Sequence, residues 1–125
     1  MSFLAGLNDA QRRAVDHHEG PLLVVAGAGS GKTRVLTHKM CHLIKEEDYK
    51  PENILAVTFT NKAAREMKER VKGLLNQEEL PITIGTFHSV CARILRSESK
   101  HLGLTPQFAI YDVQDQLDLY KIILR

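Results

Sequence analysis

Residues 26–33 read Ala-Gly-Ala-Gly-Ser-Gly-Lys-Thr, a glycine-rich segment that directly follows an apolar run, Leu22–Ala26. The run has the length of a strand and is predicted to lie centrally in a sheet, covered on both faces. After the segment, apolar residues recur at helical spacing. A buried strand, a glycine-rich loop and a helix are the framework of a phosphate-binding loop. Its pattern, Gly-x-x-x-x-Gly-Lys-Ser/Thr, is matched except for Ala26 at the first glycine.

Phosphate binding gives this composition a chemical reason. Glycines let backbone amides approach a polyphosphate closely, and the free amides of a helix N-terminus stabilise negative charge. Lys32 is predicted to contact the β and γ phosphates and the Thr33 hydroxyl to ligate Mg²⁺, so these two are the candidate catalytic residues. The alternative is a glycine-rich turn that carries Lys-Thr by coincidence, and the flanking strand and helix argue against it. The loop residues predicted to bind nucleotide are Ala28, Gly29, Ser30, Gly31, Lys32 and Thr33.

Apolar runs and amphipathic segments alternate along the rest of the chain. Further strands are predicted at 54–59, 82–87 and 108–111. The alternation predicts an α/β fold in which crossover helices connect a parallel sheet. A first helix is predicted from Asn8 to about His18, with an Asn8–Gln11 capping box, and a second after the glycine-rich loop. A third is predicted from an Asn61 cap onward and a last one from Asp112 onward. Between them, a helix is predicted after residue 87, with Val90, Cys91, Ile94 and Leu95 facing inward.

Asp112 follows an apolar run, as a Mg²⁺-binding carboxylate of an ATPase would. No acidic residue follows it, because position 113 is Val. The residue is also well suited to cap the last helix. Asp112 is therefore predicted to be an N-cap and is not assigned to metal.

Composition excludes several classes of protein. A chain of 125 residues with 43% hydrophobic and 26% charged residues is typical of a folded domain, and the net charge of +2 does not by itself indicate nucleic acid. Cys41 and Cys91 lie far apart and are predicted to be reduced, buried thiols. Because neither a membrane span nor a signal peptide is recognisable, we expect a cytoplasmic protein without membrane contact.

Residues 61–72 combine five basic with two acidic side chains. Three i,i+4 pairs are expected there, Lys62/Glu66, Arg65/Glu69 and Glu66/Arg70. This pairing favours a solvated helix face over a face directed at DNA.

Together with the loop, three more segments match the motifs of one family in the family's order. They are Leu7-Asn8-x-x-Gln11-x-x-Ala14-Val15, Thr58-Phe59-Thr60-Asn61-Lys62-Ala63-Ala64 and Thr86-Phe87-His88-Ser89. With these motifs the chain resembles the N-terminal part of the motor domain of UvrD/Rep/PcrA-type superfamily 1 DNA helicases. The family's phosphate loop also carries Ala at the first position and includes Arg34.

The resemblance implies further roles for individual residues. Gln11 would recognise adenine through paired hydrogen bonds, although the same side chain is also expected to cap its helix. On pattern alone Phe59 is predicted to be a core residue, whereas the resemblance implies that it lies on the DNA path. The residues implied in binding single-stranded DNA are Thr58, Phe59, Thr60, Asn61, Thr86 and His88.

The resemblance also implies an incomplete RecA-like P-loop NTPase domain. Residues 1–111 would form its N-terminal part, and 112–125 the start of an inserted helical accessory domain. The Asp-Glu motif, the later arginine motifs and the second RecA-like domain are not in the chain. The parent protein is therefore expected to be an ATP- and Mg²⁺-dependent 3′–5′ helicase on single-stranded DNA. The chain alone is expected to bind nucleotide weakly, to hydrolyse essentially none and to self-associate through exposed surface.

Two other functions use the same loop. A small P-loop nucleotide kinase would need a lid, an acceptor pocket and catalytic arginines, which are not recognisable here. A non-catalytic nucleotide-binding module is disfavoured, because Lys32 and Thr33 are both intact.

Overall fold

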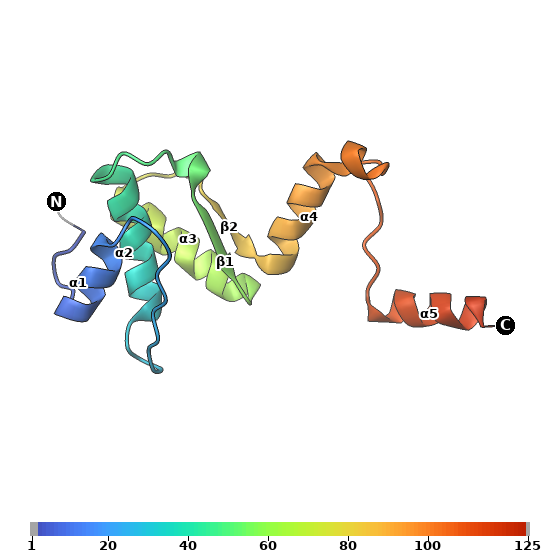
Figure 1. Cartoon of the computed structure of the whole chain (residues 1–125), viewed down its shortest axis with the longest axis horizontal. Helices are drawn as coiled ribbons and strands as arrows, with labels where there is room; N and C mark the ends of the chain where they lie inside the picture. The colour runs from blue at the N-terminus through green and yellow to red at the C-terminus, as the bar shows by residue number, and fades with distance from the viewer. Residues whose placement is uncertain (1–2, 125) are drawn as a thin grey trace. The chain divides into compact units, whose positions relative to one another are not determined.

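The computed structural model describes residues 3–124 (Figure 1). Its residues form two compact units, 1–90 and 91–125, whose boundary falls within one helix, and each unit is described by itself. The predicted domain boundary between 111 and 112 stays a prediction, and Arg125 lies outside the described residues. In chain order the elements are α1 (Asp9–Asp16), α2 (Lys32–Lys45), the 3-10 helix η1 (Pro51–Asn53), β1 (Leu55–Thr58), α3 (Asn61–Leu75), β2 (Thr83–Thr86), α4 (Phe87–Ser97), the 3-10 helix η2 (Ser99–Leu102) and α5 (Val113–Ile123).

Helix α2 is the central element of the first unit, because it packs against α1 on one side and α3 on the other (Figure 1). Its Val35 belongs to an apolar cluster with α1 residues. Its Met40 and Cys41 belong to a second cluster with Met67 and Val71 of α3. Burying such side chains contributes roughly 1.5–3 kcal/mol each, so these two clusters fix the position of α2.

Strands β1 and β2 form a two-stranded parallel sheet, as the α/β prediction requires, with α3 as the crossover helix. Leu55 pairs with Thr83 and Thr58 pairs with Thr86. Ile82, just before β2, is buried in the cluster between α2 and α3, so that helix packing also anchors the sheet. The predicted class is therefore confirmed in outline, and two of the four predicted strands are present within residues 3–124.

The predicted central strand at 22–26 is wrong. Its residues belong to no strand, and Leu23 and Val25 are 86% and 88% exposed. Leu22 and Val24 are about half as exposed and line a pocket of about 320 Å³ beside α1 and α2. A strand requires backbone partners, and β1 and β2 pair with each other instead. Only one face of the segment is therefore covered by the described residues.

The second unit departs from expectation in the same way. Residues 108–111 form no strand, and Ile110 and Tyr111 are exposed. In α4 only Val90 is buried, whereas Cys91, Ile94 and Leu95 are exposed, contrary to the prediction. Helical periodicity predicts which face is apolar, but burial also needs a partner surface.

Helix ends agree better with expectation because they depend on local chemistry. Asn8 and Gln11 form the predicted capping box of α1, although α1 ends at Asp16 and not at His18. Asp112 caps α5 by accepting from the Asp115 amide. The predicted Asn61 cap is wrong: Thr60 accepts from the Ala63 amide, and Asn61 is the first residue of α3.

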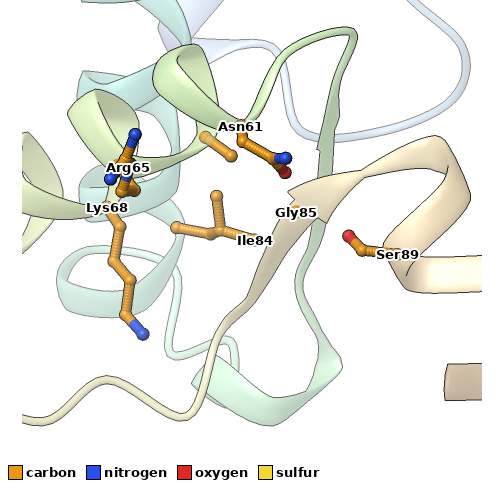
Figure 2. Close-up of a pocket in the computed structure, with 7 residues that line it drawn as sticks. Asn61, Arg65, Lys68, Ile84, Gly85 and Ser89 are labelled. Carbon is orange, nitrogen blue, oxygen red and sulfur yellow. The ribbon is translucent and has the colours of Figure 1, made fainter.

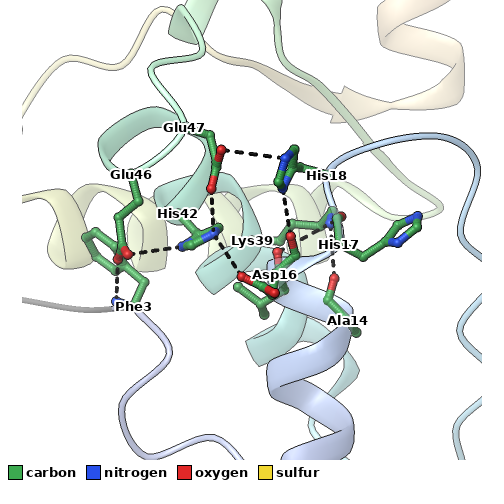
Figure 3. Close-up of polar contacts among 10 residues, drawn as sticks. Phe3, Ala14, Asp16, His17, His18, Lys39, His42, Glu46 and Glu47 are labelled. Atoms are coloured by element: carbon green, nitrogen blue, oxygen red, sulfur yellow. Dashed lines mark hydrogen bonds and ion pairs between the residues drawn. The ribbon is translucent and has the colours of Figure 1, made fainter.

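Polar contacts join α1 to α2 (Figure 3). The Lys39 ammonium donates to the carbonyls of Ala14, Val15 and His17 at the C-terminal end of α1. Burial lowers the pKa of Lys39, and the Asp16 carboxylate partly opposes this shift. The buried His42 ring lies 3.5–3.8 Å from carboxylate oxygens of Asp16 and of two acidic residues after α2, Glu46 and Glu47. These contacts hold the start of the chain against α2.

No helix within residues 3–124 is long and apolar enough to span a membrane.

Replacing Met67 with Ala should lower the free energy of unfolding by about 2–5 kcal/mol, because Met67 is buried in the cluster between α2 and α3. Urea denaturation measures this loss. The control is Leu74→Ala on the same helix, where the side chain is 38% exposed and the loss should be clearly smaller. Equal losses would contradict the assigned core.

The two cysteines should differ in reactivity towards iodoacetamide. Burial raises the pKa of the Cys41 thiol to about 12, whereas Cys91 is exposed. Because the thiolate is the nucleophile, the native chain should take up one adduct, at Cys91, and the urea-unfolded chain two. Peptide mass spectrometry identifies the sites, and rapid native labelling of Cys41 would contradict its burial.

Candidate functional site

The glycine-rich loop wraps around the ammonium group of Lys32. Lys32 Nζ donates to the carbonyl oxygens of Ala26 at 2.8 Å and Gly27 at 2.9 Å. Gly29 and Gly31 have φ angles of 74° and 83°, in the left-handed region that favours glycine. Gly31 is the N-cap of α2, so the loop ends at a helix N-terminus with its free amides and positive dipole end. The arrangement gathers positive charge at an exposed loop.

Hydrogen bonds tie the loop to itself and to α1. Ser30 Oγ donates to the Gly27 carbonyl at 2.6 Å. Gln11 Nε2 donates to the Ser30 carbonyl at 3.0 Å, while Gln11 Oε1 accepts from the Asn8 amide at 3.1 Å. Both ends of the Gln11 side chain are therefore engaged, one in the helix cap and one in the loop. Each end of the amide still has one unused site, because the NH₂ group has two hydrogens and the oxygen two lone pairs.

Arg34 and Thr33 complete the start of α2. Both side chains are exposed. A Cβ added at Gly6 would lie 3.2 Å from Arg34 Nη2, so the guanidinium lies beside the segment before α1. The structure thus brings Gln11, Arg34 and the loop together from two distant parts of the sequence.

A second cluster forms where β1 and β2 end. Because Thr58 pairs with Thr86, the residues after them leave the sheet at the same level. The rings of Phe59 and Phe87 lie 5.5 Å apart, tilted by 50°. Phe59 is 91% exposed and Phe87 47%, so the core prediction for Phe59 is wrong. Sequence reasoning missed Phe87, although the repeated Thr-Phe at both strand ends was a usable signal.

The polar residues at these strand ends differ in availability. Thr58 Oγ1 donates to the Thr60 carbonyl, and Thr60 Oγ1 caps α3. Thr86 is buried and its hydroxyl donates to Ser89 Oγ at 3.1 Å. Asn61 and His88 are exposed. The predicted DNA-binding residues therefore gather at one sheet edge, where Asn61, His88 and the two rings face solvent and Thr86 acts within the fold.

Metal binding has little support from the side chains. Within residues 3–124 no group of three or more His, Cys, Asp or Glu side chains could hold a metal ion. Thr33 is exposed and its hydroxyl oxygen is a ligand type that Mg²⁺ accepts. A Mg²⁺ ion here would need its other ligands from a nucleotide and water.

Comparison with known proteins identifies the family. The sequence model of the UvrD/REP helicase N-terminal domain matches residues 7–125. This chain belongs to the UvrD/REP helicase N-terminal domain family. It is 55% identical over 123 residues to the ATP-dependent DNA helicase PcrA of Bacillus subtilis (strain 168), a match that covers 98% of this chain. PcrA proteins of Staphylococcus aureus (strain Mu50) and Staphylococcus epidermidis are 51% and 50% identical over 124 residues, 99% of this chain. The chain spans 17% of the length of these relatives.

Family membership confirms the resemblance drawn from the four motifs, which all lie within the matched residues. A small α/β unit with a parallel β1–β2 pair fits part of a UvrD/REP N-terminal domain. The roles of the individual residues in the glycine-rich loop and at the strand ends stay predictions.

Replacing Gly31 with Ala should destabilise the chain by about 1–2 kcal/mol, the usual penalty for a Cβ in the left-handed region. The new Cβ would also lie 2.8 Å from Gln11 Nε2 and disturb its bond to Ser30. Urea denaturation and the NMR shift of the Gln11 side-chain amide report the two effects. Gly27→Ala is the control, because no atom lies within 4 Å of its added Cβ. Equal stability of both variants would contradict the strain at Gly31.

Proposed function

We propose that this chain is the ATP-binding, N-terminal part of the motor of a 3′–5′ DNA helicase that moves along single-stranded DNA, in DNA repair or replication in the cytoplasm. The family and the relatives named ATP-dependent DNA helicase PcrA support the reaction class. The observation that carries the proposal is the Lys32 ammonium held inside a glycine-rich loop at the start of α2.

In this proposal the phosphates of ATP bind in the glycine-rich loop. A phosphate oxygen carries a full negative charge, so it competes well with the carbonyls of Ala26 and Gly27 for the Lys32 ammonium. Amides of Ala28, Gly29, Ser30 and Gly31 add neutral donors without side-chain obstruction at the two glycines. Mg²⁺, held through the Thr33 hydroxyl, supplies charge neutralisation at the phosphates.

Gln11 is proposed to bind the adenine of ATP, and Arg34, the last residue of the phosphate-loop motif, to contact the nucleotide. The Gln11 amide carries both a donor and an acceptor, as recognition of an adenine edge requires. It already touches the loop through Ser30, and Arg34 is the third residue of α2. The second Nε2 hydrogen and the second lone pair of Oε1 are the groups proposed to bind the base.

Single-stranded DNA is proposed to lie at the strand ends. Phe59, almost fully exposed, offers a face on which a base can stack, an interaction worth about 1–3 kcal/mol without sequence preference. Thr58, Thr60, Asn61 and His88 supply short polar groups beside it, and Thr86 holds the local turn.

Translocation would need parts of a longer protein that this chain does not contain. Movement requires two domains that close on ATP and open after hydrolysis, and the chain spans only 17% of its relatives. The chain alone is therefore proposed to bind nucleotide weakly and not to turn it over. The exposed Leu23 and Val25 support self-association of the isolated chain.

Replacing Lys32 with Ala should abolish Mg²⁺-dependent ATP binding by the chain, because the loop loses its only mobile cation. Fluorescence titration with a labelled ATP analogue, with and without Mg²⁺, measures the affinity. Lys45→Ala is the matched control, since Lys45 is exposed at the far end of the same helix. Its affinity should equal that of the unsubstituted chain.

Other outcomes would favour other functions. Unchanged ATP binding by the Lys32 variant would indicate a non-catalytic module that binds nucleotide elsewhere. Phosphoryl transfer to a nucleoside monophosphate would indicate a kinase. Rapid DNA-stimulated hydrolysis by the chain alone would contradict the need for further domains.

A further inference from the structure

One face of α3 and the edge of β2 enclose an open pocket of about 520 Å³ in the first unit (Figure 2). Asn61, Arg65 and Lys68 lie on the α3 side, at positions that share one helix face. Ile84 and Gly85 form the floor, and Ser89 lies at the start of α4. The pocket thus combines two cations with an amide and a hydroxyl, which are all groups that bind phosphate oxygens.

The two cations of this pocket have no acidic partner among the described residues. The expected Arg65/Glu69 pair is absent, because Glu69 contacts Lys72 at 3.9 Å. Glu66 contacts Lys62 at 4.0 Å, as expected, so the two glutamates of α3 contact Lys62 and Lys72. The charges of Arg65 and Lys68 are therefore available to an anion.

Two residues that line the pocket are close in sequence to the exposed aromatic pair. Asn61 follows Phe59 by two residues, and Ser89 follows Phe87 by two residues. Ser89 Oγ is held by Thr86, whose hydroxyl donates to it and whose carbonyl accepts from it. Exposed rings beside a cationic groove are the two components of sequence-independent binding to single strands, since bases stack on the rings while cations follow the backbone.

We propose that Arg65 and Lys68 bind backbone phosphates of the single-stranded DNA whose bases stack at Phe59 and Phe87. Asn61 and Ser89 orient the same phosphates from the two sides of the pocket. The site deepens the proposed function, on whose DNA path it rests, and it gives Phe87 a share in base stacking. Arg65 contributes a planar fork that fits two phosphate oxygens, and Lys68 contributes a point charge.

The test is the affinity of the double variant Arg65→Gln/Lys68→Gln for a fluorescein-labelled oligothymidylate, measured by anisotropy across a salt series. Removing two phosphate contacts should weaken binding roughly tenfold or more near physiological salt and flatten the salt dependence by about 1.4 in log–log slope. The loss should be equal for thymidine, cytidine and adenosine oligonucleotides, because phosphate contacts carry no sequence information. ATP affinity should not change.

The matched control is Lys62→Gln/Lys72→Gln, which removes the same charge from the same helix at residues that contact glutamates. This variant should lose clearly less affinity. The charge-retaining swap Arg65→Lys/Lys68→Arg should restore most of the binding. Glutamine favours helix, Lys62, Arg65 and Lys68 are exposed, and Lys72 is only partly buried, so all variants should fold.

Three results would overturn the proposal. Equal losses in the pocket and control variants would indicate a general effect of helix charge. Unchanged affinity in the pocket variant, while Phe59→Ala weakens binding, would reject the pocket and leave the DNA path intact. Absence of oligonucleotide binding by the unsubstituted chain would reject both the pocket and the proposed DNA path. The ATP affinity of the same chain would still test the nucleotide site separately.

Discussion

The burial of α2 between α1 and α3 is the packing on which the rest of the first unit depends. Val35 faces one apolar cluster and Cys41 the other, so a single helix joins the N-terminal segment to the crossover unit. Lys32 is the first residue of α2 and adjoins the glycine-rich loop. The two apolar clusters that fix the position of α2 therefore also fix the position of the loop. Lys39 and His42 add polar contacts to the end of α1 on the same side. The Gln11–Ser30 bond is a consequence, because α1 can reach the loop only from this position.

In the glycine-rich loop, the Lys32 ammonium donates hydrogen bonds to two carbonyls of the loop itself. Carbonyl oxygens are neutral acceptors, so each bond is weaker than one to a charged phosphate oxygen. The lysine is thus prepositioned inside the loop by contacts that a phosphate can replace at low cost. Gln11 is held in a similar way, because its two hydrogen bonds, to the Asn8 amide and the Ser30 carbonyl, keep the side-chain amide beside the loop.

The register of the β1–β2 pair determines which residues lie together at the ends of the two strands. A shift of one residue between β1 and β2 would move Thr58 from Thr86 and separate the Phe59 and Phe87 rings. The parallel crossover through α3 also brings Arg65 and Lys68 of that helix to the same pocket as Ile84 and Gly85 of β2. Two features with separate origins, strand pairing and helix charge, therefore meet at one edge of the sheet.

The sequence by itself determined the local features. Asn8, Gln11 and Asp112 cap their helices as predicted, because a cap depends on residues three positions apart. The glycine-rich loop, the parallel pairing and the family also follow from short motifs and their order. Tertiary structure alone decided which apolar segments are covered: within residues 3–124, the segment 22–26 has strand composition but pairs with no strand, and Ile94 and Leu95 of α4 stay exposed. The sequence also left open which charges of α3 pair: Glu69 contacts Lys72, and among the described residues Arg65 has no acidic partner, because alternative surface pairs on one helix differ little in energy.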